Sequence, residues 1–220
     1  MTRYRCLVLD HDDTAVMSTP CIHYPSFMDT LKTLRPDVQM SLREYVRLSF
    51  DPGFEKLCYD VLRFTKEEMD FQLQNWQRFV RSAIPDFHTG MPDIIRRQRA
   101  EGGLVCVVSH SYSEVVLRDY AHAQLPAPDC VLGWELGAKK QKPHPWPLQE
   151  IMRRYALSPG DILMVDDLKP GFDMARAAGC DFAAALWAYE DESTRQMLRA
   201  GSAGGKALNT VQELHTLLFA

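Results

Sequence analysis

The sequence lacks several features that mark particular classes of protein. No segment is long enough and apolar enough to span a bilayer, and the first residues lack the apolar region of a signal peptide. The net charge of −4 brings no basic stripe with it, which argues against binding to nucleic acid. There is also no internal repeat and no long low-complexity tract. We therefore expect a cytoplasmic protein that has neither a membrane nor a nucleic-acid partner.

Cysteines are few and contain no Cys-x-x-Cys pair. Three of the six, Cys6, Cys106 and Cys180, lie in or beside apolar runs, where a reduced and buried thiol is expected. The rest of the composition, 46% apolar and 25% charged residues, is ordinary for a globular protein. A chain of 220 residues is long enough for one domain with an insertion.

Short apolar runs alternate with helical patterns over most of the chain. The runs expected to form strands are 6–9, 104–108, 130–132, 162–165 and, more weakly, 181–186. From residue 91 onward each run is followed by a segment with helical spacing, and a loop at 202–205 precedes a last helix. Alternation of this kind predicts an α/β fold with a doubly wound parallel sheet.

The stretch between the first two strands reads as helical throughout. Asp51-Pro52-Gly53 interrupts it, and Thr65-Lys-Glu-Glu68 is a capping box that opens a helix with an apolar face including Met69, Leu73 and Val80. We expect a helical subdomain at 17–85, inserted into a core formed by 1–16 and 86–220.

Acidic residues follow the first apolar run at once. Asp10 and Asp12 would project to the same side if the extended geometry persists through them. Two carboxylates held so close repel each other and are costly to desolvate, so a divalent cation is the simplest compensation. A solvated turn explains this segment alone equally well, because Asp and Thr are common turn residues.

Other strand ends carry reactive groups as well. Ser109 ends the second run, Asp166 and Asp167 end the fourth, and Lys142 lies in a polar loop. Each has a simple explanation as a helix cap, a solvated lysine or a turn. In an open parallel sheet, however, the ligand crevice lies at the carboxyl ends of the strands, so their joint appearance predicts one polar site.

With these residues in place, the chain resembles the haloacid dehalogenase-like (HAD) hydrolase superfamily. That family has Asp-x-Asp-x-Thr after an apolar strand, a Ser or Thr ending a second strand, a Lys before a helix, and an acidic pair after a later strand. The matching residues are Asp10, Asp12, Thr14, Ser109, Lys142, Asp166 and Asp167, in the family's order. The resemblance covers nearly the whole chain and implies a Rossmann-like core with an inserted all-helical cap.

The resemblance also implies a chemical role for each position. Asp10 would attack phosphorus to form an aspartyl-phosphate, and Asp12 would act as general acid and base. Ser109 and Lys142 would hold the transferring phosphoryl group as part of the catalytic set. The candidate phosphate-binding residues are Ser109, His110, Lys142 and Thr14.

A Mg²⁺ ion is the implied cofactor. Its ligands would be Asp10, the backbone carbonyl of Asp12 and the second acid of the later pair, Asp167, with Asp166 in support. The sequence departs from the family pattern at three places: Asp13 replaces the usual Gly, His110 stands where Asn is frequent, and Gly171 occupies a position that is commonly acidic. Asp173 is the nearest acid that could replace the one missing at 171.

The function implied is that of a phosphatase acting on a small phosphomonoester metabolite. A phosphotransferase or mutase with the same intermediate is one alternative, and a non-catalytic phospho-acceptor or binding protein is another. His23 and Tyr24 could contact the substrate from the cap, although packing of the first cap helix is the favoured interpretation. The substrate, and the choice between a monomer and a dimer, stay open at this stage.

Overall fold

The computed structural model describes residues 2–137 and 139–220. The chain divides into two compact units, one formed by the chain up to Met17 together with Asp86–Ala220, and one formed by Ser18–Pro85. We call them the sheet unit and the helical unit. The use of the helical unit as a cap stays a prediction. Among the described residues, no helix has the length and apolar character needed to cross a membrane.

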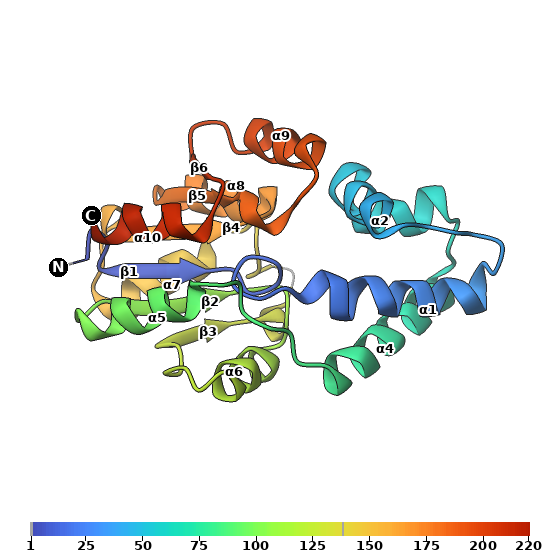
Figure 1. The fold of residues 1–220 in the computed structure, drawn as a ribbon, viewed down its shortest axis with the longest axis horizontal. Helices are drawn as coiled ribbons and strands as arrows, with labels where there is room; N and C mark the ends of the chain where they lie inside the picture. Colours follow the sequence, from blue (N-terminus) through green and yellow to red (C-terminus); the bar gives the residue numbers. More distant parts are fainter. Residues whose placement is uncertain (1, 138) are drawn as a thin grey trace. The chain divides into compact units, whose positions relative to one another are not determined.

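The sheet unit is built on a six-stranded sheet in which every neighbouring pair is parallel (Figure 1). The strand order is β3-β2-β1-β4-β5-β6, so β1 lies between β2 and β4. The bounds are β1 Cys6–Leu9, β2 Leu104–Val108, β3 Cys130–Leu132, β4 Ile162–Asp166, β5 Asp181–Ala185 and β6 Lys206–Leu208. The α/β doubly wound fold expected from the sequence is confirmed.

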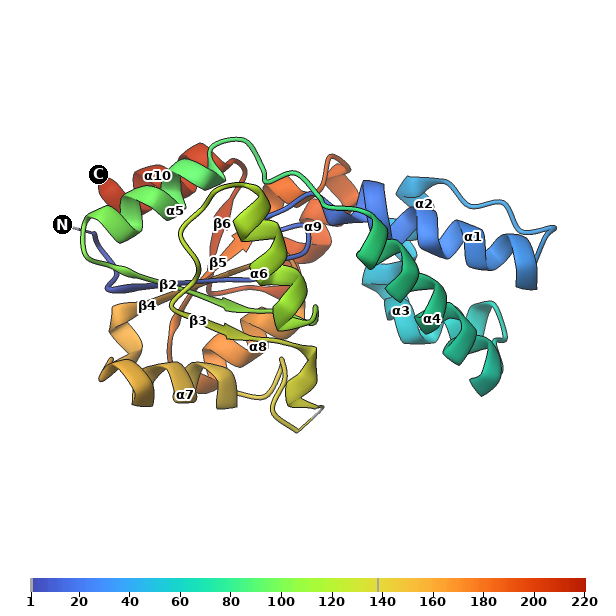
Figure 2. The same ribbon diagram turned by 90° about the horizontal axis from the view of Figure 1, so that it is seen from below.

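Helices cover both faces of this sheet. On one face lie α5 (Met91–Ala100), α6 (Ser113–His122) and α10 (Val211–Phe219); α7 (Trp146–Tyr155) and α8 (Lys169–Ala178) lie on the other (Figure 2). Leu7 and Leu9 of β1 pack with Ile94, Tyr120 and Leu214 in the core of the first face. Burial on both faces explains why the strand sequences read as unbroken apolar runs.

Two elements were not expected from the sequence. Strand β6 has only three residues and is half-exposed at the edge of the sheet, so it carries no long apolar run. Helix α9 (Glu192–Gly201) begins at Asp191, whose side chain accepts a hydrogen bond from the backbone N–H of Thr194. Its sequence is mostly polar, and only Thr194 and Leu198 are buried in it.

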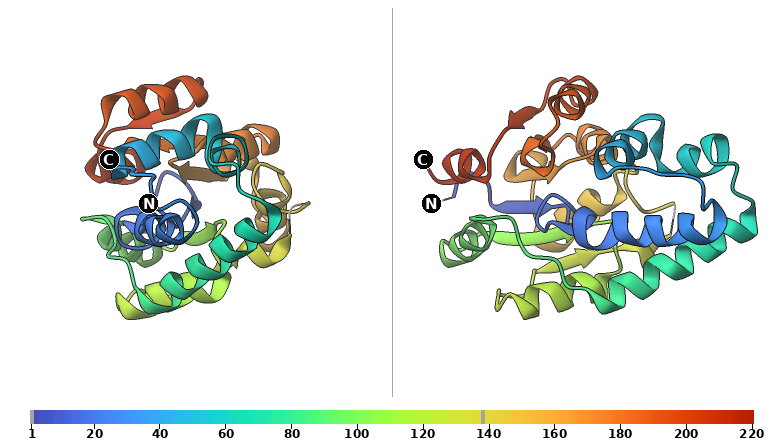
Figure 3. Two further views of the ribbon diagram at one scale, coloured as in Figure 1. Left: turned by 90° about the vertical axis from the view of Figure 1, so that its right-hand side faces the viewer. Right: turned by 45° about the vertical axis from the view of Figure 1, so that its right-hand side comes forward.

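The helical unit contains α1 (Tyr24–Leu34), α2 (Leu42–Leu48), the short α3 (Phe54–Lys56) and α4 (Lys66–Ser82), joined in part by π-helical turns. Helices α1 and α4 run side by side (Figure 3). The buried apolar core of this unit consists of Phe27, Leu31, Tyr45, Leu57, Cys58, Leu62 and Phe64. The predicted capping box is confirmed, with Thr65 accepting from the N–H of Glu68 and Glu68 from that of Thr65.

The buried face of α4 is more polar than its sequence suggests. Gln72 and Asn75 are buried, while Leu73, which the apolar pattern placed inside, is 39% exposed. The side-chain amide of Asn75 donates to the carbonyl oxygen of Ser26 and to the hydroxyl of Thr30 on α1. Contact with polar groups of α1 thus determines the inner face, which corrects the expectation for Leu73.

The chain leaves and re-enters the sheet unit at neighbouring points. Val16 and Phe87 form an antiparallel bridge. The backbone N–H of Met17 donates to the carbonyl of Asp86 at 2.8 Å, and that of His88 donates to the carbonyl of Ala15 at 3.0 Å. The segments around residues 16 and 87 are therefore held together by the backbone of the sheet unit itself.

Candidate active site

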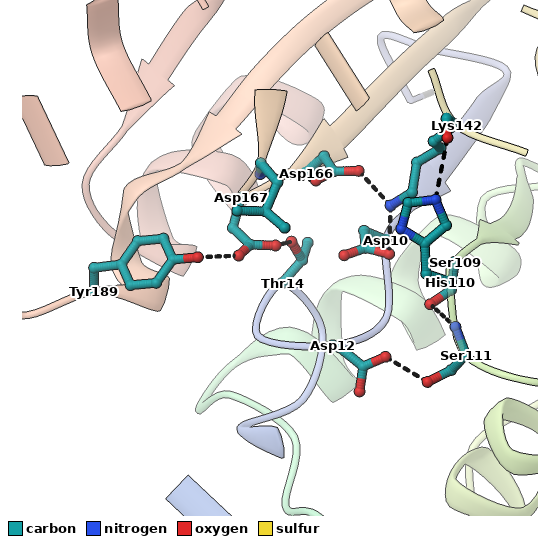
Figure 4. A network of polar contacts seen from close by, with 11 residues as sticks. Asp10, Asp12, Thr14, Ser109, His110, Ser111, Lys142, Asp166, Asp167 and Tyr189 are labelled. Atoms are coloured by element: carbon teal, nitrogen blue, oxygen red, sulfur yellow. Dashed lines mark hydrogen bonds and ion pairs between the residues drawn. The ribbon is translucent and has the colours of Figure 1, made fainter. Parts of the chain in front are cut away.

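Polar side chains collect at the carboxyl ends of three adjacent strands, β2, β1 and β4 (Figure 4). Asp10 directly follows β1, Ser109 directly follows β2, and Asp166 is the last residue of β4. Because β1 pairs with both β2 and β4, these three side chains start from adjacent strand ends. Lys142 comes from the loop before α7, and Asp167 follows β4.

The ammonium group of Lys142 joins two of the acids. Its Nζ lies 2.7 Å from Oδ1 of Asp10 and 2.6 Å from Oδ2 of Asp166, and all three residues are buried. Burial alone lowers the pKa of Lys142, but the adjoining carboxylates of Asp10 and Asp166 outweigh it and raise that pKa above its usual value. Lys142 therefore stays charged and offsets the repulsion between the acids.

The charge of Lys142 does not fully offset the burial of Asp166 and Asp167, the two acids at the end of β4. Burial raises the pKa of Asp166 to about 7, although Lys142 opposes it. Burial, followed by the charges of Asp166 and Asp10, raises the pKa of Asp167 as well. Groups of this kind take up a proton unless a further cation stabilises their charged form.

The arrangement of the acids fits a metal ion. One carboxylate oxygen from each of Asp10, Asp166 and Asp167 lies within 4.8 Å of the others, and all three residues are buried. Hard divalent cations such as Mg²⁺ prefer oxygen ligands of this type. The oxygens of Asp166 already accept from Lys142 and from the backbone N–H of Leu168, the latter at 2.8 Å.

Asp167 is held by two hydroxyl groups. Thr14 donates to its Oδ1 at 2.9 Å, and Tyr189 donates to its Oδ2 at 2.5 Å. Burial and the charge of Asp167 raise the pKa of Tyr189, so the tyrosine keeps its proton. Thr14 was expected near the phosphate, and in the structure its hydroxyl bonds the acid. Tyr189 was not foreseen, because it lies 22 residues after Asp167 and outside the four sequence motifs.

A second unforeseen residue holds Asp12. The hydroxyl of Ser111 donates to Oδ2 of Asp12 at 2.5 Å, while the backbone N–H of Ser111 donates to the hydroxyl oxygen of Ser109 at 3.0 Å. One residue thus links the ends of β1 and β2. The Ser-His-Ser sequence after β2 was the available signal, since residues two apart in an extended segment project to the same side.

His110 contacts the loop of the lysine. Its Nε2 lies 3.1 Å from the carbonyl oxygen of Lys142, and since a carbonyl only accepts, Nε2 is the donor. Burial, and then the charge of Lys142, lowers the pKa of His110. The neutral imidazole therefore braces the backbone of Lys142, and its contact with phosphate stays a prediction.

The departures from the family pattern have local explanations. Asp13, in place of Gly, adopts a φ of +58°, which Asp tolerates better than most residues, and its carbonyl oxygen accepts from Nε2 of His88 at 2.8 Å. At Gly171, an added Cβ atom would stand 2.4 Å from Cγ of Asp166, so a side chain there would clash with that carboxyl group. Asp173 does not replace the missing acid, because its carboxylate pairs with Lys169 and Arg176 on the surface of α8.

His11, between the two acids of the first motif, turns into the core. Its Nε2 donates to Oδ2 of Asp119 on α6 at 3.0 Å, and both side chains are almost completely buried. Arg118 binds the other oxygen of that carboxylate at 2.7 Å. This link fixes the loop of the first motif to α6.

The two candidate substrate contacts of the helical unit bond within that unit. Nδ1 of His23 accepts a hydrogen bond from the indole N–H of Trp76 at 3.0 Å, and the rings stack. The hydroxyl of Tyr24 donates to the carbonyl of Met40 at 2.8 Å. These contacts agree with the interpretation that His23 and Tyr24 pack within the helical unit.

The sequence matches one family model. Residues 7–185 match the family described as haloacid dehalogenase-like hydrolase. The matched segment is well over half of the chain and includes every residue of the site discussed above except Tyr189. No curated protein matches the chain with significant sequence similarity.

Solved structures with the same fold are numerous. A protein from Bacteroides fragilis assigned as a haloacid dehalogenase-like hydrolase has a TM-score of 0.78 at 16% identity, covering 96% of this chain and 99% of that one. CbbY from Rhodobacter sphaeroides, in complex with phosphate, has a TM-score of 0.69 at 16% identity, covering 96% of each chain. A protein from Haemophilus somnus described as a predicted phosphoglycolate phosphatase has a TM-score of 0.65 at 20% identity, covering 84% of this chain and 86% of that one. At these identities the likeness is one of fold.

Proposed function

Because this chain belongs to the haloacid dehalogenase-like hydrolase family, we propose that it is a Mg²⁺-dependent phosphatase that hydrolyses a small phosphomonoester metabolite through an aspartyl-phosphate. The observation that carries the proposal is the buried contact of Lys142 with Asp10 and Asp166 at the carboxyl edge of β1 and β4. This contact supports the proposal because it sets Asp10, the proposed nucleophile, beside a fixed positive charge, in a site that also contains Asp12.

The fold relatives support a phosphorylated substrate. CbbY has been solved with phosphate and with xylulose-1,5-bisphosphate, and another relative is described as a predicted phosphoglycolate phosphatase. The two ligands of CbbY and the substrate in the name of the other relative are phosphate itself or small molecules that carry it. The helical unit would serve as the cap that selects among such molecules, and the six free cysteines agree with a cytoplasmic location.

The proposed reaction uses two acids. A carboxylate oxygen of Asp10 attacks phosphorus, and the bond from phosphorus to the substrate oxygen breaks while Asp12 gives that oxygen a proton. Asp12 then removes a proton from water, whose oxygen attacks phosphorus and releases inorganic phosphate together with the carboxylate of Asp10. Lys142 and Ser109 stabilise the charge on the transferring phosphoryl group.

The proposed Mg²⁺ would be held by Asp10, Asp167 and the backbone carbonyl of Asp12, with Asp166 supporting the site through Lys142. A bound Mg²⁺ supplies positive charge that stabilises the phosphoryl oxygens. On this assignment, Asp167→Asn weakens Mg²⁺ binding far more than Asp166→Asn, as measured by calorimetry with Mg²⁺ alone. Equal losses in the two variants would contradict the division of roles between these acids.

The decisive experiment is Asp10→Asn. Hydrolysis of p-nitrophenyl phosphate should disappear, because an amide is a far weaker nucleophile, while circular dichroism stays that of the wild type. Asp173→Asn, which changes an acid on the surface of α8, is the matched control and should keep full activity. Retained hydrolysis by Asp10→Asn would overturn the mechanism. A panel of phosphorylated metabolites, with and without Mg²⁺, would then identify the substrate.

A further inference from the structure

The segment that follows β5 reaches the site with two aromatic side chains. After the 3₁₀ turn Leu186–Ala188, Tyr189 donates to Oδ2 of Asp167 at 2.5 Å. Two positions earlier, the indole N–H of Trp187 donates to the carbonyl oxygen of Thr14 at 3.0 Å. Neither aromatic residue belongs to the four motifs, yet Tyr189 bonds Asp167 and Trp187 bonds Thr14, which itself donates to Asp167.

We propose that Tyr189 is a positioning residue that fixes the carboxylate of Asp167 in the orientation needed to bind the metal ion. The proposal rests on the metal site of the proposed function and deepens it. Thr14 holds Oδ1 and Tyr189 holds Oδ2, so rotation of the carboxylate would break both hydrogen bonds. Each oxygen has a second lone pair, which remains available to a cation.

The position of Tyr189 distinguishes it from the reacting groups. Figure 4 shows its hydroxyl approaching Asp167 from the side opposite to Asp10 and Lys142. Tyr189 is 9% exposed, and Thr14 is fully buried. Tyr189 therefore acts on the metal ion through Asp167. Hydrogen-bond partners of metal-binding carboxylates usually affect the affinity for the metal in this way.

A purely structural role would give a different result. If the hydroxyl only satisfied a buried polar group, its removal would lower stability and leave metal affinity unchanged. Tyr4 provides the matched control, because its hydroxyl also donates to a carboxylate, Oδ2 of Asp181 at 2.6 Å. Asp181 is the first residue of β5. This pair therefore lies at the amino ends of the strands, whereas the candidate site lies at their carboxyl ends.

The experiment compares Tyr189→Phe, Tyr4→Phe and the wild type by calorimetric titration with Mg²⁺ alone. We expect Tyr189→Phe to bind Mg²⁺ about tenfold more weakly, the lower end of what such partners contribute, and Tyr4→Phe to bind it as the wild type does. Hydrolysis of an aryl phosphate by Tyr189→Phe should then recover at high Mg²⁺, because the apparent KM for Mg²⁺ changes rather than kcat.

Equal Mg²⁺ affinity in Tyr189→Phe and the wild type would overturn the inference and leave the proposed function intact. If the wild type itself binds no Mg²⁺, the metal dependence in the proposed function fails, and the inference fails with it. Thr14→Val removes the other hydrogen bond to Asp167 and is a second test should Tyr189→Phe not fold. Unchanged Mg²⁺ affinity in Thr14→Val would likewise overturn the inference.

Discussion

Gly171 lies directly against the carboxyl group of Asp166. A Cβ atom at position 171 would stand 2.2 Å from Oδ2 and 2.4 Å from Cγ of Asp166, far inside contact distance. Asp166 is fully buried and bonded to Lys142 and to the N–H of Leu168, so it has little freedom to move away. The placement of Asp166 therefore leaves no room for a Cβ atom at position 171, which explains why no acid stands there.

We predict that Gly171→Ala destabilises the protein by about 1–3 kcal/mol, the usual cost of overpacking. A Gly→Ala change at an unstrained position normally stabilises by about 0.4–1 kcal/mol, so the sign itself is diagnostic. Gly160→Ala is the control, because a Cβ there meets nothing within 4 Å. Urea denaturation measures both free energies of unfolding, and equal effects in the two variants would contradict the prediction.

Ser111→Ala should slow the hydrolysis of esters with poor leaving groups. The variant loses the hydrogen bond that orients Asp12, and we expect roughly a tenfold fall in kcat, less than general acid–base catalysis contributes in full. The fall should be larger for an alkyl phosphate than for p-nitrophenyl phosphate, whose leaving group needs no proton.

The control for this variant is Ser193→Ala, since Ser193 also donates to an aspartate, Asp191, but on the exposed surface at the start of α9. Its rates should match the wild type with both substrates. An equal fall of the two rates in Ser111→Ala would show that the hydroxyl does not act through the acid function of Asp12.

Asp119→Ala should destabilise the protein by about 3 kcal/mol, as expected when one partner of a buried pair is removed. The change leaves Nε2 of His11 buried without its carboxylate and leaves Arg118 without its nearest acid. Asp173→Ala breaks only exposed ion pairs and should cost less than about 1 kcal/mol. Similar losses in the two variants would contradict the importance of the His11 link.

The stability of the metal-free protein should respond to pH through Asp166. Its folded pKa of about 7 is far above the usual 3.8, so between these values the folded state holds a proton that the unfolded state has lost. The contribution of Asp166 to the free energy of unfolding therefore falls as pH rises through this window, by up to about 4 kcal/mol.

Other groups act in the opposite direction in part of that window. Burial lowers the pKa of His88 and of His110, so their contributions rise with pH. Asp166→Asn removes the titration of Asp166 and the part of the pKa shift of Asp167 that the charge of Asp166 causes. The stability of this variant relative to the wild type should therefore increase from pH 5 to pH 8 without Mg²⁺. A constant difference, measured by urea denaturation at the two pH values, would contradict the raised pKa.

Much of the site could be predicted because it depends on strand ends. Asp10, Ser109 and Asp166 end buried apolar runs, and a parallel sheet brings such ends to one edge whatever the details of packing. The same local patterns predicted the capping box at Thr65 and the positions of five strands. Three-residue β6 and the mostly polar α9 have no comparable pattern, since their apolar contacts are too few.

The remaining contacts depend on side-chain direction over long sequence separations. Tyr189 lies 22 residues from its partner Asp167 and Asp119 lies 108 residues from His11, and neither is in a pattern that indicates its partner. The inner face of α4 was assigned wrongly at Leu73 for the same reason, since Asn75 gains hydrogen bonds to α1 that outweigh the apolar periodicity. To predict such contacts, the direction of each side chain must be known to within one helical turn.

The bridge between Val16 and Phe87 has a consequence for how the sequence can change. The segments around residues 16 and 87 are joined by backbone hydrogen bonds. Residues 18–85 therefore form a long loop whose two ends are held together within the sheet unit. The entropy of closing such a loop grows only slowly with its length. A change in the length of the segment 18–85 should therefore cost little closure entropy, while β1 keeps its register with β2 and β4.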